Sequence, residues 1–412
     1  MKKTGCQESD CDQKKELWDI IEQIGWIGKE ADGSITRLPA SSAYDQASEV
    51  VKMLMLREDM EVTTDAVGNV HGVRQGSEPS RGTIMFGSHL DTVRHGGLFD
   101  GTLGIAAAIS CIRRLRREQI ILPCNLEIVC FQGEEGSPLG GTFGSRAMMG
   151  LIDLRVPGYL DRLNDYGFTP EQIAESRIDT SSKKCFLELH IEQGKILETE
   201  QKDIGIVTGI VGITRYQIRV CGKANHAGTT PMNLRCDALV AAAGLVQSIS
   251  ETASQYTNGL VATVGQLQVF PNAVAVIPGQ VELVLEIRHM DQHIVDDYAE
   301  RIRQEIRLLE QNRTGIHVEM EQIVKKGSVV CDEGLQELYA SCCEKLGYSY
   351  RRIASGAGHD GNAIGQKIPT AMIFVPSREG LSHCKEEWTD LDQAMKGADV
   401  LYEAVKMEAE LG

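Results

Sequence analysis

Histidine and carboxylate side chains recur where short apolar segments of this chain end. One apolar segment leads into Gly87–Thr92, a second leads into Gly133–Gly136, and a third carries His190. A fourth leads to Ser382–His383, and Asp100 directly precedes a helical pattern. Three histidines with one aspartate and one glutamate suit zinc, manganese or cobalt better than calcium or magnesium. The sequence therefore predicts a metal centre.

Five ligands are one too many for a single tetrahedral ion, and they fit two ions that share a bridging carboxylate, about 3.5–4 Å apart. Glu134 and Glu135 are adjacent, so their side chains diverge. One can bind metal while the other stays free as the general base for the attacking water. Asp91, two residues after His89, can hydrogen-bond that imidazole and fix its tautomer. The expected chemistry is hydrolysis.

The elements that position these groups form an α/β pattern. Apolar strands separated by helices indicate a largely parallel sheet, and open α/β sheets place ligands at the carboxyl ends of their strands. A helix is expected over 101–115, ending in basic residues. The expected strands are 81–88, 126–132, 186–190 and 370–376.

The middle of the chain follows a different order of elements, β-α-β-β-α-β, which is that of a ferredoxin-like sandwich. The ranges are a strand over 209–223, a helix over 235–254, strands over 261–270 and 274–289, a helix over 292–310 and a strand over 315–322. The second of the paired strands is expected to break near Pro278. We therefore expect a catalytic domain over 1–207 and 322–412, with 208–321 as an inserted domain.

Composition excludes some functions. The net charge of the 412 residues is −16, which argues against nucleic acid or an anionic membrane as the partner. No apolar run reaches the length of a membrane span, and residues 1–15 have no apolar signal region. Twelve cysteines without a C-x-x-C pair favour reduced thiols in the cytoplasm.

The ligand segments resemble the dinuclear metallohydrolases related to aminoacylases and carboxypeptidases, and within them the N-carbamoyl-L-amino-acid hydrolases and allantoate amidohydrolases. The resembling segments occur in the family's order over nearly the whole chain. They are Gly87-Ser-His-Leu-Asp-Thr-Val, Gly96-Gly-Leu-Phe-Asp-Gly, Glu134-Glu-Gly-Ser, Leu189-His-Ile-Glu-Gln-Gly, Asn225-His-Ala-Gly-Thr-Thr-Pro-Met, Ser355-Gly-Ala-Gly-His-Asp and Ser382-His.

The resemblance assigns roles to individual residues. It implies two divalent ions, with His89 and His190 binding one each, Asp100 bridging, and Glu135 and His383 completing the sites. It makes Glu134 the base and His226 a ligand of the substrate or transition state. For the substrate it implies a polar contact from Asn272, a carboxylate clamp at Arg288 and pocket positions at Gln193, Gly358 and His359. It also implies a homodimer formed through the insert, and a small carbamoyl or ureido substrate that bears a carboxylate.

Two positions depart from the resemblance. Pro138-Leu139 stands where the branch usually has Arg-Phe, and Cys384 follows the last histidine; we expect Cys384 not to bind metal. An aminopeptidase or N-acyl-amino-acid deacylase is the alternative enzyme, and a binding protein that lost its metals is a more remote one. Gly356–Gly361 matches G-x-G-x-x-G, but no clear βαβ unit with a ribose-binding acid follows. No G-x-S-x-G elbow or Walker loop occurs.

Overall fold

The computed structural model describes the backbone of residues 4–411 and the side chains of residues 12–411. The chain divides into two compact units, Met1–Ile210 with Val330–Gly412, and Val211–Val329. The second unit extends past the expected end at residue 321 because its last strand, β12, runs to Lys326. None of the helices in residues 4–411 has both the length and the apolar character that a membrane span requires.

The first unit is built on a nine-stranded sheet in the order β1-β2-β4-β3-β5-β15-β6-β13, with β14 pairing β6. Its centre is parallel: β3 pairs in parallel with β4 and β5, and β5 with β15. The strands are β1 Glu61–Thr64, β2 Val70–Arg74, β3 Thr83–His89, β4 Asn125–Phe131, β5 Lys183–Ile191, β6 Ile204–Ile210, β13 Val329–Val330, β14 Tyr350–Ser355 and β15 Thr370–Val375. The expected α/β fold is confirmed.

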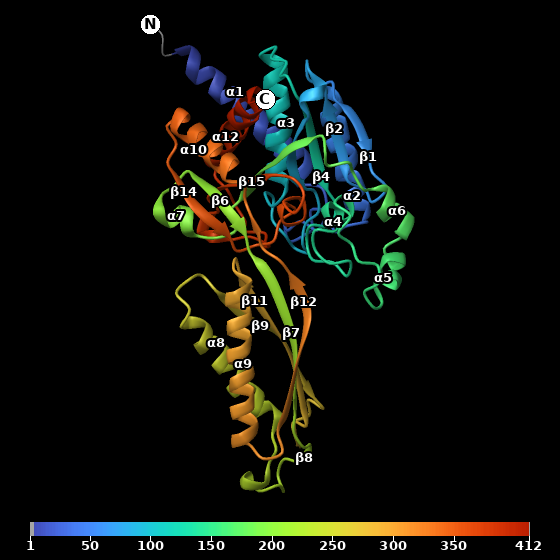
Figure 1. Ribbon diagram of the computed structural model, residues 1–412, viewed down its shortest axis with the longest axis vertical. Coiled ribbons are helices and arrows are strands. Elements are labelled where there is room, and N and C mark those ends of the chain that lie inside the picture. The colour runs from blue at the N-terminus through green and yellow to red at the C-terminus, as the bar shows by residue number, and fades with distance from the viewer. Residues whose placement is uncertain (1–3, 412) are drawn as a thin grey trace. The chain divides into compact units, whose positions relative to one another are not determined.

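Helices cover both faces of this sheet (Figure 1). Since side chains alternate across a strand, Ile84 and Phe86 of β3 join the larger core, whereas Met85 joins a smaller core on the other face. The larger core is formed with α1 Thr4–Gly25, α2 Ser42–Arg57, α3 Thr102–Arg117, α10 Glu333–Leu346 and α12 Leu391–Glu410. The other helices are α4 Phe143–Met148, α5 Tyr159–Asp165, α6 Pro170–Glu175, α7 Ile196–Glu200 and α11 Gly361–Ile364. Burial on both faces explains why the strands are nearly continuous apolar runs.

Gly101 allows helix α3 to begin directly against the end of β3. Its φ is +64°, and a Cβ at this position would lie 2.4 Å from the carbonyl oxygen of His89. A side chain here would push the helix away from the strand. This close approach brings Asp100, the residue before Gly101, next to the imidazole of His89.

The second unit is a four-stranded antiparallel sheet in the order β12-β7-β11-β9. Alternate residues of β11, from Val281 to Ile287, are buried in a core with the two helices. Pro278 separates a short β10 from β11, as expected, and β10 pairs with β8. The elements are β7 Gly212–Cys221, β8 Asn225–His226, α8 Ala238–Ser254, β9 Val261–Phe270, β10 Val276–Ile277, β11 Gln280–His289, α9 Gln292–Asn312 and β12 His317–Lys326.

Candidate metal centre

The carboxyl ends of the parallel strands bring the candidate ligands together. β3 ends at His89, β5 carries His190 one residue before its end, and β4 leads into the Glu134–Glu135 turn. The segment after β15 supplies His383, and Asp100 lies two residues before α3. These five groups come from five different segments of the chain.

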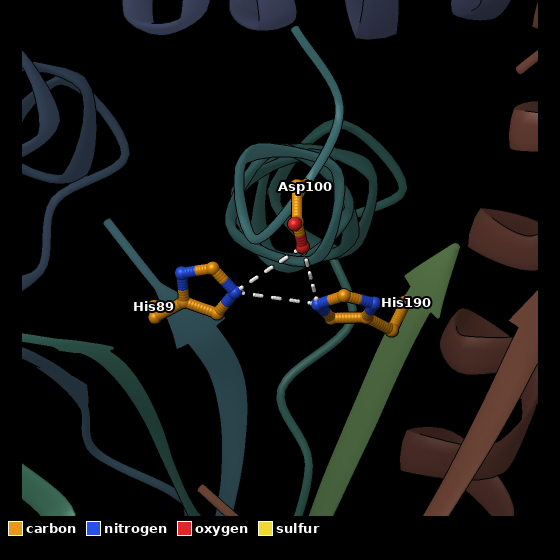
Figure 2. Close-up of side chains that lie close together, drawn as sticks. All are labelled: His89, Asp100 and His190. Atoms are coloured by element: carbon orange, nitrogen blue, oxygen red, sulfur yellow. Dashed lines mark hydrogen bonds and ion pairs between the residues drawn. The ribbon is translucent and has the colours of Figure 1, made fainter. Parts of the chain in front are cut away.

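A first triad consists of His89, Asp100 and His190 (Figure 2). Asp100 Oδ1 lies 3.4 Å from Nε2 of His89 and 3.1 Å from Nε2 of His190. The two Nε2 atoms are 3.3 Å apart. All three side chains are nearly fully buried.

The tautomers of both histidines follow from their other ring nitrogen. Nδ1 of His89 lies 3.0 Å from the backbone oxygen of Asp91, and Nδ1 of His190 lies 3.0 Å from that of Ile191. A carbonyl oxygen only accepts, so each Nδ1 carries the proton of the neutral ring. Each Nε2 therefore directs a lone pair toward the other and toward Asp100. Three electron pairs that converge in a buried space favour a bound cation.

The spacing suits zinc or a similar ion. Zinc–nitrogen bonds of about 2.0–2.1 Å in a tetrahedral site place neighbouring ligand atoms about 3.3 Å apart. The separations in the first triad, 3.1–3.4 Å, match this value. Buried Asp100 Oδ1 also lacks a hydrogen bond of good geometry among the described residues, as expected of an oxygen positioned to bind a metal ion.

A second triad shares Asp100 through its other oxygen. His383 Nε2 lies 3.1 Å from Asp100 Oδ2 and 3.3 Å from Glu135 Oε1. These carboxylates raise the pKa of His383 to about 11. The surrounding field is therefore strongly negative, which favours bound cations.

The grouping differs from the one that the resemblance implied. His89 and His190 surround the same oxygen of Asp100, so they fit one ion together, and Glu135 and His383 fit the other. Asp100 remains between the two triads. Cys384 belongs to none of the clusters of metal-ligand atoms found in residues 12–411.

Asp91 acts differently from the expectation. Its carboxylate is 4.0 Å from His89 Nδ1, beyond hydrogen-bond range, and only its backbone oxygen holds the ring. The fully buried carboxylate accepts the backbone N–H groups of Gly133, Glu134 and Glu135 at 2.8, 3.1 and 3.1 Å. Asp91 therefore fixes the turn that presents both glutamates.

Glu134 has the surroundings of a general base. Its carboxylate lies in a cluster with Glu135 and His89, with ligand atoms within 4.8 Å of one another. Loss of solvation raises its pKa well above the ordinary value, and the negative charges of Glu135 and Asp360 raise it further. A glutamate whose pKa is raised in this way accepts a proton more readily than one in water.

The expected pocket residues of the first unit have different surroundings. Gln193 donates from Nε2 to Asp100 Oδ2 at 3.1 Å, beside the metal centre. His359 is 1% exposed and packs its ring at 4.7 Å from that of His190, with Nε2 2.9 Å from Ser355 Oγ. The His359 ring is therefore packed against His190, and its role as a pocket residue stays a prediction. Gly358 is partly exposed in the loop before α11.

The expected substrate residues of the insert lie in the second unit. Gly228 N–H donates to Nδ1 of exposed His226 at 3.0 Å, so the neutral ring carries its proton on Nε2 and can donate it to an oxygen. Exposed Asn272 has a φ of +57° and lies close to the β8–β10 pair. Arg288 is half-buried, and its Nε donates to Glu286 Oε1 at 2.7 Å.

His226 and Arg288 lie at opposite ends of this unit. Arg288 pairs with Ile213 near the end of β11, whereas the β8–β10 pair precedes the start of β11 at Gln280. Eight residues of strand separate Gln280 from Arg288, or roughly 27 Å at 3.4 Å per residue. Figure 1 shows β8 at the end of the unit where β7 finishes.

Sequence reasoning missed several buried polar groups around the centre. Glu188 Oε1 accepts the hydroxyl of Ser88 at 2.7 Å, and burial raises the pKa of Glu188. Burial also raises the pKa of Asp360 to about 8, although Ser145 donates to it. A charged residue two positions before His190 in an apolar strand was a usable signal for Glu188. Asp360 lies in a loop and has no such signal.

The two departures have structural settings. Pro138 is exposed, whereas Leu139 is buried in a small core with Phe143 and Tyr159. Leu139 therefore packs inside the unit rather than facing a ligand. The G-x-G-x-x-G segment leads into α11, which has only four residues and is a poor phosphate-binding helix.

Comparison with known proteins identifies the relatives of this chain. The profile of Peptidase family M20/M25/M40 matches residues 85–407. An N-carbamoyl-L-amino acid amidohydrolase of Geobacillus stearothermophilus is 34% identical over 402 residues, covering 95% of this chain and 98% of that protein. An allantoate amidohydrolase of Bacillus subtilis (strain 168) is 34% identical over 404 residues, covering 94% and 97%. The crystal structure of a hydantoinase/carbamoylase family amidase from Burkholderia multivorans matches with a TM-score of 0.85 and 31% identity, covering 96% and 98%.

A mixed sheet whose parallel centre gathers buried histidine, aspartate and glutamate at its carboxyl ends defines a hydrolase of the α/β class with a candidate metal centre. The chain belongs to Peptidase family M20/M25/M40. Within that family it lies on the amidohydrolase branch, whose members hydrolyse carbon–nitrogen bonds other than peptide bonds. The resemblance drawn from the sequence segments is thus confirmed.

Proposed function

We propose that this chain hydrolyses the linear C–N bond of an N-carbamoyl-L-amino acid or of a ureido acid such as allantoate. The observation that carries the proposal is the pair of ligand triads that share Asp100, with Glu134 beside them. Two of the relatives described above are named for these two activities. The proposed substrate is a small anion. The net charge of −16 does not prevent its binding, because a local arginine can hold its carboxylate.

The chemistry divides between ions and side chains. Two divalent ions such as zinc, manganese or cobalt, when bound, lower the pKa of water and polarise the substrate carbonyl. Glu134 accepts the proton of the attacking water and passes it to the leaving nitrogen. His226, whose Nε2 carries a proton, donates a hydrogen bond to the oxygen on which negative charge develops.

The substrate site needs two copies of the chain. Arg288 suits a carboxylate because its guanidinium can donate two parallel hydrogen bonds. The separation of roughly 27 Å along β11 exceeds the length of a small ureido acid. Arg288 and His226 of one chain therefore cannot contact the same molecule. We infer that His226 and Asn272 serve the site of a partner subunit in a homodimer.

The outer strand β9 offers a surface for this dimer. β9 is the edge of the four-stranded sheet. Val261, Leu267 and Phe270 on it are 55%, 43% and 43% exposed. An edge strand with exposed apolar side chains favours association with another copy.

The proposed compartment is the cytoplasm. Ten cysteines in the described residues are free thiols, and seven of them are buried. A reducing compartment keeps thiols in this state.

The test is a substrate panel assayed for ammonia release with defined metals. N-carbamoyl-L-amino acids and allantoate should release ammonia, and amide-capped analogues should react poorly. Arg288→Ala should lower kcat/KM for the free acids, because the carboxylate would lose its charged partner. The loss should correspond to several kcal/mol of transition-state stabilisation. Equal turnover of capped and free substrates by the wild type would favour a broader amidase. Peptide cleavage without ammonia would favour an aminopeptidase.

A further inference from the structure

A buried carboxylate outside both triads lies four residues after His383. Glu387 is 2% exposed. Its Oε1 accepts the backbone N–H groups of Phe99 and Asp100 at 2.9 and 3.0 Å, and its Oε2 accepts the hydroxyl of Ser382 at 2.8 Å. One side chain therefore joins the loop that carries Asp100 to the loop that carries His383.

The two loops fit closely around this carboxylate. A Cβ at Gly97 would lie 2.3 Å from Glu387 Oε1, so only glycine leaves room for the side chain. The neighbouring ring of Trp388 meets Phe99 edge-on, with 5.2 Å between ring centroids. Both Glu387 and the residue after it therefore dock on the segment before Asp100.

The loop that carries His383 depends on such tethers. His383 has a φ of +57°, a left-handed conformation that is unfavourable for a residue with a Cβ. Its side chain is 49% exposed, so packing around it is sparse. Hydrogen bonds from outside the residue must therefore hold its backbone, and those at Ser382 and Glu387 flank it on both sides.

We propose that Glu387 is a positioning residue, which holds Asp100 and His383 at the spacing that a shared ion needs. That spacing is 3.1 Å between Asp100 Oδ2 and His383 Nε2. This inference rests on the proposed metal centre and goes beyond it by assigning a residue that binds no metal.

The test compares Glu387→Ala, Glu387→Gln and Ser382→Ala with a matched control, Asp203→Asn. The Asp203 carboxylate also accepts one backbone N–H and one serine hydroxyl, both from Ser349, but in a different part of the unit. Its other oxygen forms an ion pair with Lys396. Metal-stripped proteins are titrated with zinc against a chromogenic chelator. The melting temperature of each metal-free protein is measured in parallel.

Glu387→Ala should weaken the affinity for at least one ion by about 10–100-fold, the usual effect of losing a group that orients a metal ligand. Glu387→Gln should be intermediate, because its amide oxygen still accepts from Phe99 and Asp100. Ser382→Ala should weaken affinity less, since it removes only one tether. Asp203→Asn should lower the melting temperature and leave zinc affinity unchanged.

Two results would overturn the inference, and they can be told apart. If Glu387→Ala lowers the melting temperature but binds zinc like the wild type, Glu387 is only structural and the metal centre stands. If the wild type itself binds no zinc, the metal centre fails together with the inference. Should Glu387→Ala not fold, unchanged zinc affinity in both Glu387→Gln and Ser382→Ala would decide against the proposal.

Discussion

The Nε2 atoms of His89 and His190 face each other at 3.3 Å, and both Nδ1 atoms donate to backbone oxygens. Each ring therefore presents a lone pair to the other. Burial alone would lower the pKa of His89, but Asp100 and Glu134 raise it well above its ordinary value. The negative groups around the two rings therefore favour a cation between them.

Removal of metal should abolish activity. The ligands are side chains with no covalent attachment to an ion, so chelation should strip the protein, and zinc, manganese or cobalt should restore turnover. Elemental analysis should find two ions per chain in the wild type and fewer in His89→Ala or His190→Ala. His71→Gln, which changes a buried histidine outside both triads, should retain two. Full turnover by a verified metal-free sample would contradict the metal centre.

Variants of Glu134 and Glu135 should distinguish the general base from the metal ligand. Glu134→Gln should keep two ions and lose about 10²–10⁴ in kcat, the usual worth of a general base. Glu135→Gln should instead lose metal, because Glu135 Oε1 lies 3.3 Å from His383. Metal content and kcat of both variants decide the matter. Loss of metal from the Glu134 variant alone would reverse the two roles.

Mixed dimers should recover activity if His226 works across the subunit interface. His226→Ala and Arg288→Ala should each be nearly inactive. When both are dissociated, mixed and reassociated, a mixed dimer contains one site with intact Arg288 and the partner's intact His226. A statistical mixture should therefore regain about a quarter of wild-type activity. Mixing either variant with itself is the control. No recovery, with exchange verified by mass spectrometry, would place both residues in one chain's site or in none.

His71 should make stability depend on pH. Burial alone lowers its pKa, but the carboxylates of Asp65 and Glu127 outweigh this and raise the pKa to about 9. Because the folded pKa exceeds the ordinary 6.5, the stabilisation is fully present below pH 6.5 and is lost as pH rises through about 9. It should amount to about 3 kcal/mol. Denaturant unfolding of wild type and His71→Gln from pH 6 to 9.5 should show curves that converge as pH rises. A constant difference would mean that His71 stays neutral.

Much of the architecture could be predicted from local pattern. Apolar runs with helices between them determine a parallel sheet, and the β-α-β-β-α-β order determines the second unit, because both depend on side-chain periodicity. Element ends were less certain: the expected strand over 209–223 is two strands, β6 and β7, divided at Val211. The divided strand contains the boundary between the two units.

The sequence by itself determined which residue types reach the site, because parallel strands share one edge at their carboxyl ends and each strand there leads to a histidine or carboxylate. Only the tertiary structure decided how they are paired. It placed His89 and His190 on one oxygen of Asp100, turned the Asp91 carboxylate toward three backbone N–H groups, and inserted Glu387 beside Asp100. The hydrogen bond from Phe99 to Glu387 spans 288 residues. Such contacts depend on the distance between folded segments, and no local spacing of residues encodes that distance.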